Sequence, residues 1–320
     1  MTSDLIPRVI LQPIPNEVAA HSGAQEPHPA TADTVRVRKR KATSFSTIRP
    51  AELVIRYILL IIVLLIAIAP FLWELSTSLK GPGESVTTAV PRFIPEHPTF
   101  ESYIRVISLV PVIQYVINSL AVAAMGIFGN VIFASLAGFA LARMQFRGKK
   151  YVVGFILAAL ILPAEATIVS QFVLITKMGL ADTLVGVALP GFVSILNVLL
   201  MYNAFRMIPE EIDQAAVIDG ATSLQRLWHV GLPSVKGTVA VIIIFAFIGA
   251  WDDFLWPLIV LTTSSKFTLT VGLQYLAGTF SSDPRAVAAG VMIAFIPLVI
   301  FFATLQRHFF KGVEEGGVKG

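Results

Sequence analysis

Two adjacent carboxylates stand inside an apolar stretch of the chain. Asp252 and Asp253 lie between Trp251 and Trp256, within residues 238–261, a run long enough to cross a bilayer. A carboxylate at the middle of a bilayer costs roughly 2.5–3.5 kcal/mol on insertion scales. Neighbouring residues of a helix point about 100° apart. At least one of the two carboxylates is therefore expected to face a wet cavity or a partner helix.

These residues allow two interpretations. Aromatic rings and carboxylates are suited to the faces and hydroxyl groups of a polyol, so one Asp beside Trp251 and Trp256 could line a path for such a molecule. The alternative is a structural hydrogen bond to a second membrane subunit. Asn118, in another apolar run, is a further candidate for the path, or else it makes an interhelical hydrogen bond.

A second polar stretch, residues 210–233, interrupts the apolar chain. Pro209 suits the first position of a helix, where its missing N–H costs nothing. Two glutamates follow, and carboxylates are favourable at the positive end of the helix dipole. Asp219-Gly220 is typical of a helix end, because glycine takes the left-handed conformation easily. The pattern predicts one short helix before Gly220.

A second short helix is predicted directly after this turn. Thr222 and Gln225 form a T-x-x-Q capping box, and Gly231 and Pro233 are expected to end the helix. Small residues on the first helix would let another backbone approach closely. From spacing alone, the segment is either an amphipathic connector on the membrane surface or a docking element for a soluble partner.

The composition places both stretches in a membrane protein. Of the 320 residues, 55% are hydrophobic and 14% are charged, whereas a soluble domain has about 25% charged residues. The sequence has no cysteine, which excludes a disulfide framework, a zinc–thiolate site and a cysteine nucleophile.

Six apolar windows predict an all-α integral membrane protein with six transmembrane helices. The windows lack a period of two, which argues against a barrel. They cover residues 54–75, 112–141, 151–174, 183–205, 238–261 and 286–305.

The basic residues orient these helices. With the N-terminus in the cytoplasm, 18 of the 24 Lys and Arg fall on the cytoplasmic side, so both termini are expected inside. Residues 1–50 are rich in Pro, Ala, Thr and Ser and are predicted to form a disordered cytoplasmic tail. The basic run at 36–41 is interpreted as an anchor near anionic lipid and not as a nucleic-acid site. Residues 51–320 then form the membrane domain.

The polar segment resembles the EAA loop of binding-protein-dependent ABC importer permeases. The family pattern has E-A-A, two further residues, D-G-A, and an L-P some residues later. This chain has Gln214-Ala215-Ala216, Asp219-Gly220-Ala221 and Leu232-Pro233 at that spacing. Gln214 stands where the family has glutamate, which puts the charge-assisted part of the contact in doubt.

Other stretches carry the same resemblance. Residues 140–148 are similar to the A-x-A-R-x-x-F-x-G turn of sugar-type permeases, and residues 247–254 to their F-x-G-A-W-N-E-F run, with Asp252 and Asp253 for Asn and Glu. Residues 269–273 and the final Gly-Gly-Val-Lys-Gly are similar to further family motifs. The resemblance is to the maltose-type, MalG-like group, which implies the type I (MetI-like) permease fold.

The resemblance implies a carbohydrate permease of the bacterial cytoplasmic (inner) membrane. Its implied partners are a second, MalF-like permease, two ATPase subunits and an extracytoplasmic solute-binding protein. ATP and Mg²⁺ would bind the ATPase subunits, and no cofactor is expected on this chain. The chain lacks the phosphate-binding pattern G-x-x-x-x-G-K-[ST]. It is therefore not expected to be an enzyme.

The loop at about 206–236 would couple the chain to the ATPases, with Gly220 as its pivot. We hypothesise that Glu210, Glu211 or Asp213 compensates for Gln214. The resemblance assigns coupling to Glu210, Glu211, Asp213, Gln214, Ala215, Ala216, Asp219, Gly220, Ala221, Leu232 and Pro233.

Two alternative functions stay open. The same class of transporter could carry glycerol phosphate or a related polyol, which would favour cationic groups in the spans; the middle of each predicted span lacks Lys and Arg. The other alternative is a membrane scaffold that recruits a soluble partner, which predicts neither a wet cavity nor a dependence on ATP.

Overall fold

The computed structural model of this chain describes residues 50–86, 92–279 and 283–317. Within these ranges every secondary-structure element is a helix, as the sequence predicts. The chain divides into two units, residues 1–58 and 59–320. In the first unit only the beginning of a helix is described, and the predicted tail up to residue 49 lies outside the described residues.

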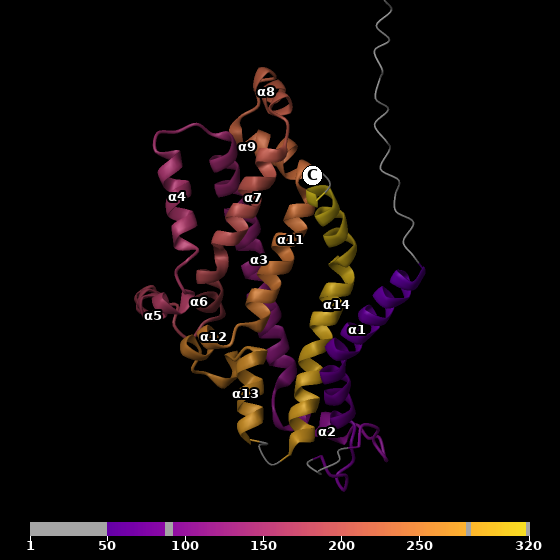
Figure 1. Cartoon of the computed structure of the whole chain (residues 1–320). Helices are drawn as coiled ribbons and strands as arrows, with labels where there is room; N and C mark the ends of the chain where they lie inside the picture. Colours follow the sequence, from indigo (N-terminus) through magenta and orange to yellow (C-terminus); the bar gives the residue numbers. More distant parts are fainter. Residues whose placement is uncertain (1–49, 87–91, 280–282, 318–320) are drawn as a thin grey trace, which may run out of the picture. The chain divides into compact units, whose positions relative to one another are not determined.

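The described residues form several long helices and a number of short ones (Figure 1). The helices of the chain are α1 (Pro50–Ser78), α2 (Glu101–Leu109), α3 (Val112–Arg143), α4 (Lys149–Ala159), η1 (Ala164–Thr167), α5 (Ile168–Lys177), α6 (Leu184–Ala188), η2 (Leu189–Phe192), α7 (Ile195–Met207), α8 (Glu210–Ile218), α9 (Ser223–Gln225), η3 (Arg226–Gly231), α10 (Leu232–Ser234), α11 (Lys236–Asp252), α12 (Leu255–Val260), η4 (Ser264–Lys266), α13 (Leu269–Thr279) and α14 (Pro284–Gly317).

Three helices among the described residues are long and apolar enough to cross a membrane: Glu52–Ser78, Val112–Arg143 and Pro284–Gln306. They match the first, second and sixth predicted windows. Two helix pairs qualify only when each is taken as one broken span: Leu184–Phe192 with Ile195–Met207, bent by 42°, and Ser223–Ser234 with Lys236–Asp252, bent by 86°. The described chain therefore has three to five candidate spans and not six continuous helices.

The third predicted window, 151–174, is not one helix. Helix α4 ends at Ala159, and the chain restarts as η1 and α5 after an extended Pro163 (φ −66°, ψ 133°). Proline has no N–H to donate, and its ring displaces the residue before it from helical geometry. The window predicted as one transmembrane helix is therefore completely broken at Pro163.

The fifth predicted window, 238–261, is also broken. Helix α11 ends at Asp252, and Asp253 is extended (φ −66°, ψ 123°) before α12 begins. The two carboxylates therefore lie at a helix end and not in the middle of a continuous span, which corrects the prediction. At this end the last carbonyl groups of α11 lack intrahelical partners.

Helix α3 is the centre of the second unit, because α7 and α11 both pack along it. A Cβ atom added to Gly138 would lie 2.6 Å from the Cβ of Met201, so glycine permits the close approach of α3 to α7. A buried amide pair joins the same helices: Asn197 Nδ2 donates to Asn130 Oδ1 at 2.8 Å. Asn197 thus makes an interhelical hydrogen bond.

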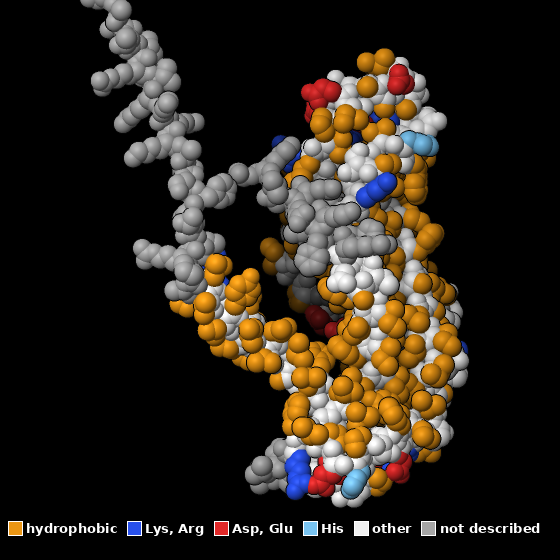
Figure 2. Space-filling view, turned by 90° about the vertical axis from the view of Figure 1, so that its right-hand side faces the viewer, with side chains coloured by type: hydrophobic (Ala, Val, Ile, Leu, Met, Phe, Trp, Pro, Cys, Tyr) orange, Lys and Arg blue, Asp and Glu red, His pale blue; other side chains and the backbone are white. Residues whose placement is uncertain are grey.

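The surface of the helices is apolar between their ends. Figure 2 shows hydrophobic side chains over most of the middle of one face, with charged side chains gathered mainly at the two ends. The membrane-length window of α1 has none of its residues buried within the chain. Such exposed apolar helices require lipid or another apolar helix around them.

A carboxylate outside the candidate spans joins two loops. Asp182 accepts hydrogen bonds at Oδ1 from the backbone N–H groups of Thr262 (2.9 Å) and Thr263 (3.0 Å), and at Oδ2 from Lys266 Nζ (2.8 Å) and Thr263 Oγ1 (2.7 Å). These bonds, led by that of Lys266, hold the pKa of Asp182 well below its usual range. Its φ of +54° is tolerated better by Asp and Asn than by most other residues.

We predict that Asp182→Asn and Asp182→Ala both lower the melting temperature by a few degrees, with the larger effect for alanine, because alanine is also strained at positive φ. A lowered pKa stabilises the folded state above the unfolded pKa of about 4, and this contribution is lost as the pH falls toward the folded value. The difference between wild type and Asp182→Asn should therefore shrink below about pH 4. A difference that is constant between pH 3 and pH 7 would contradict this account.

Candidate functional site

The polar segment forms a helical element at one end of the second unit, with α8 standing beyond the ends of α7 and α11 (Figure 1). Helix α8 begins at Glu210, one residue later than predicted, because Pro209 is extended (ψ 138°). Gly220 has φ +78°, and the N–H groups of Gly220 and Ala221 donate to the carbonyls of Val217 and Ala216. This is the Schellman arrangement, in which a left-handed glycine ends a helix.

The second helical piece begins as predicted and ends later. The Thr222 hydroxyl accepts from Gln225 N–H, and the Gln225 side chain accepts from Thr222 N–H at 2.8 Å, which confirms the capping box. Helical structure then continues past Gly231 to Ser234, so the prediction that Gly231 and Pro233 end it is wrong. The reason is a π-helical turn, η3, in which Leu232 N–H bonds to the Leu227 carbonyl five residues back.

An ion pair joins the two halves of this element. Arg226 Nε donates to Asp213 Oδ1 at 2.9 Å, and Arg226 Nη2 donates to Asp213 Oδ2. The two side chains are only 14% and 15% exposed, and the guanidinium lies over the Phe139 ring of α3. Since Arg226 occupies both carboxylate oxygens, Asp213 is not free to compensate for Gln214, and that part of the hypothesis rests on Glu210 and Glu211.

The two halves differ in burial. Leu227 is buried and Gly231 packs against Phe205 of α7, while Arg143 of α3 donates to the carbonyls of Phe205 (2.6 Å) and Ile208 at the end of α7. Helix α8, in contrast, has no buried residue, and Ile218 at its end is 85% exposed. The element is thus fixed on one side and presents the exposed helix α8, with the apolar side chain of Ile218, on the other.

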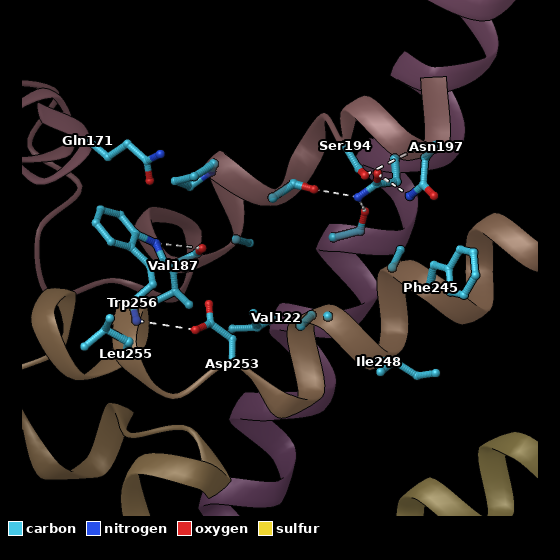
Figure 3. Close-up of a pocket in the computed structure, with 18 of the residues that line it drawn as sticks. Val122, Gln171, Val187, Ser194, Asn197, Phe245, Ile248, Asp253, Leu255 and Trp256 are labelled. Atoms are coloured by element: carbon cyan, nitrogen blue, oxygen red, sulfur yellow. Dashed lines mark hydrogen bonds between the residues drawn. The ribbon is translucent and has the colours of Figure 1, made fainter. Parts of the chain in front are cut away.

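A cavity of about 610 Å³ lies between the helices further along the same unit (Figure 3). It is lined by five groups of residues: from α3, Val122, Gly126 and Asn130; from η1 and α5, Glu165, Ile168 and Gln171; from α6 and η2, Val187, Ala188, Pro190 and Gly191; from α7 and the residue before it, Ser194, Leu196 and Asn197; and from α11 to α12, Phe245, Ala246, Ile248, Gly249, Ala250, Asp253, Leu255 and Trp256.

Asp253 lies at the break between α11 and α12, and its side chain lines this cavity. Its carboxylate accepts from the backbone N–H of Trp256 at 3.4 Å, and its carbonyl accepts from Thr270 Oγ1 at 2.7 Å. Trp256 Nε1 donates to the Val187 carbonyl at 3.1 Å, which fixes the indole ring. Figure 3 shows the Asp253 carboxylate and the Gln171 amide directed toward the same space from two different segments.

The structure brings only some of the candidate path residues together. Asp253 and Trp256 line the cavity, whereas Trp251, Asp252 and Asn118 do not. Trp251 is buried and stacked on Phe247. Asn118 donates to the carbonyls of Ser265 and Phe267, so it ties α3 to a distant loop and does not face the cavity.

Sequence reasoning did not assign five polar residues to the cavity: Asn130, Glu165, Gln171, Ser194 and Asn197. Glu165 carried a signal, since it is an ionisable residue after Pro163 in an apolar window. The other four are polar residues that only the fold brings to the cavity. Among the described residues, no group of His, Asp and Glu is arranged to hold a metal ion.

An apolar helical bundle with a cavity between its helices and an exposed helical element at one end fits a membrane transport permease. Residues 130–315 match the family of the binding-protein-dependent transport system inner membrane component. The chain belongs to this family. It is a permease subunit of an ABC importer, the non-catalytic component that resides in the inner membrane.

Relatives of known name extend over most of the chain. It is 29% identical to the galactooligosaccharides transport system permease protein GanQ of Bacillus subtilis (strain 168), a match that covers 85% of this chain and 97% of the relative. It is 30% identical to the trehalose transport system permease protein SugB of Mycobacterium tuberculosis, covering 79% and 93%. It is also 30% identical to the inner membrane ABC transporter permease protein YcjP of Escherichia coli (strain K12), covering 80% and 93%.

Solved structures share the fold. A chain of a bacterial ABC transporter that imports the acidic polysaccharide alginate matches with a TM-score of 0.70 and 25% identity, covering 80% of this chain and 95% of that one. A second chain, from the alginate transporter in complex with an alginate pentasaccharide-bound periplasmic protein, matches with a TM-score of 0.56 at 14% identity.

We predict that Asp213→Ala speeds backbone hydrogen exchange in residues 210–225 by roughly tenfold or more, because a mostly buried charged hydrogen bond contributes about 1.5–3 kcal/mol. Glu211→Ala is the matched control, since the Glu211 side chain is exposed and its removal should leave exchange unchanged. The swap of Asp213→Arg with Arg226→Asp should restore part of the protection. Equal exchange in Asp213→Ala and wild type would show that the ion pair does not hold the element.

Proposed function

We propose that this chain lines a path for neutral oligosaccharides and transmits the motion of two ATPase subunits to that path. The chain is the permease subunit of an ATP-driven carbohydrate importer, and the relatives named for galactooligosaccharides and trehalose belong to the same class. The proposed oligosaccharide path is supported by the cavity between the broken helices, which Asp253 and Trp256 both line.

The element α8–α10 is the proposed docking site for an ATPase subunit. Its exposed helix α8 offers the small side chains Ala215 and Ala216 together with the apolar Ile218. Glu210 and Glu211 are exposed at its start and are placed to take over the charge that Gln214 lacks. The remaining residues of this proposed coupling surface are Asp219, Gly220, Ala221, Leu232 and Pro233.

Closure of the ATPase subunits around Mg-ATP would then move this element as a rigid body. The Asp213–Arg226 pair and the packing of Leu227 link the element to α3 and α7, whose other parts line the cavity. In this proposal Gly220 is the point at which the exposed helix turns relative to the fixed one. The chain supplies no nucleotide site of its own, and ATP and Mg²⁺ belong to the partner subunits.

For the membrane topology we propose six crossings with both termini in the cytoplasm. The broken segments α4–α5, α6–α7 and α11–α12 would serve as the third, fourth and fifth crossings beside α1, α3 and α14. The loop of residues 144–148, flanked by Arg143 and Lys149, would lie on the cytoplasmic side together with α8. Residues 79–111 and 262–285 would then face the solute-binding protein, and the exposed apolar helices would meet lipid and a second permease subunit.

The cavity favours a neutral, hydroxyl-rich cargo. Its volume lies within the range of about 300–1,000 Å³ that is usual for ligand sites. Among the described residues that line it there is no Lys or Arg, while Glu165 and Asp253 are acidic. Glycerol phosphate would require a cationic partner, which the second permease would have to supply. A cavity with converging polar groups also argues against a scaffold that only recruits a soluble protein.

We predict that Asp253→Asn lowers ATP-driven oligosaccharide uptake by about tenfold or more in proteoliposomes, because a hydrogen bond to a charged group contributes about 1.5–3 kcal/mol. The neighbouring Asp252→Asn is the control, since Asp252 is exposed and does not line the cavity. Both variants should assemble with their partners in normal yield. Normal uptake by Asp253→Asn, or loss of assembly to the same degree as loss of uptake, would contradict the role in the path.

A further inference from the structure

Lys80, directly after α1, carries a buried ammonium group. The residue is 1% exposed, and within the described chain its Nζ atom has no hydrogen-bond partner. The ring of Trp73 lies below it, with 4.9 Å between Nζ and the ring centroid. A cation–π contact of this kind offsets part of the desolvation cost, but it leaves the N–H donors of the ammonium group without an acceptor.

A small cavity lies beside this lysine. Its volume is about 30 Å³, and Lys80 lines it together with a residue of its own segment and residues of two other segments. These are Pro82 after α1, Glu101, Ser102 and Arg105 of α2, and Asp283 and Arg285 at the start of α14. Three segments that are far apart in the sequence thus place charged side chains around one small space.

The charges around this space do not balance. Asp283 is already shared between two arginines: Oδ2 accepts from Arg105 Nη1 at 2.9 Å, and Oδ1 accepts from Arg285 Nε at 2.9 Å. Arg285 Nη1 also donates to the Gly81 carbonyl at 2.5 Å. The cations Lys80, Arg105 and Arg285 and the carboxylates Asp283 and Glu101 line the space. Glu101 is an exposed residue. The excess charge is positive, and the buried cation without a carboxylate partner is Lys80.

We propose that this space binds a single monatomic anion of the size of chloride, with the Lys80 ammonium as its main ligand. The small free space of about 30 Å³ favours one such ion over a sulfate or phosphate group with its oxygen shell. The anion accepts N–H bonds from Lys80 and faces the guanidinium groups of Arg105 and Arg285. It thereby joins the end of α1 to α2 and to the start of α14.

The experiment uses the purified full-length chain in detergent, with sodium chloride, sodium bromide or sodium gluconate at equal ionic strength. We expect the melting temperature to rise saturably by a few degrees with chloride or bromide but not with gluconate, which does not fit the space. Lys80→Met should abolish this dependence. Lys177→Met, which changes an exposed lysine at the end of α5, should retain it.

Bromide diffraction tests the site even if Lys80→Met fails to fold. Crystals of the wild-type chain grown in bromide should show an anomalous peak within contact distance of Lys80 Nζ. Ordered density without an anomalous signal would identify a water molecule, and a Glu101 carboxylate turned onto Lys80 would identify an internal ion pair. Either result, or a halide response that Lys80→Met retains, overturns the proposal.

Discussion

In a bilayer every backbone N–H and C=O group must find a partner within the protein, and this constraint explains where the chain places its polar side chains. The helices break at three places, after Ala159, at Val193–Ser194 and at Asp253, and residues at or beside each break line the same cavity. Side chains from other elements take up the freed carbonyls. Asn130 of α3 donates to Gly191, Trp256 to Val187, and Thr270 to Asp253.

The breaks have a functional consequence. Within a membrane, a broken helix can expose its polar backbone only where it lines a cavity or is buried in protein. The breaks of this chain therefore place amide and carboxylate groups at a cavity. No charged residue has to stand in the middle of a continuous membrane-spanning helix. The two proposed sites then lie on the same rigid elements. Helix α7 carries Asn197 at the cavity and Phe205 beside the docking element, while α11 runs from the docking element to Asp253.

Local chemistry made the two-part helical element α8–α10 largely predictable from sequence. The capping box at Thr222 and the left-handed Gly220 depend on residues within a few positions of each other, and both are present as predicted. The helical class follows from long apolar windows in the same way. The π-helical turn before Pro233 was missed, because its wider register depends on how Leu227 and Gly231 pack against the helices beneath them.

The long-range polar contacts could not be predicted from the sequence. Asn130 and Asn197 are 67 positions apart, and Asp182 and Lys266 are 84 positions apart. Nothing in their local patterns indicates that they meet. Window averaging also hid the helix breaks, since hydropathy stays high through Pro163 and through Asp253. One carboxylate lowers the mean hydropathy of a window only slightly. The helix nevertheless ends beside Asp253, which lines the cavity.

We expect nucleotide at the docked ATPase subunits to change access to the cavity. This chain has no cysteine, so Ser194→Cys gives it one thiol, at a helix break that lines the cavity. The unchanged transporter is the control for labelling of the partner subunits. In the assembled transporter, we expect an impermeant maleimide to label this cysteine from the cytoplasmic side without nucleotide, and from the outer side when ATP and vanadate trap the closed ATPases. Labelling from the same side at the same rate in both states would contradict the account.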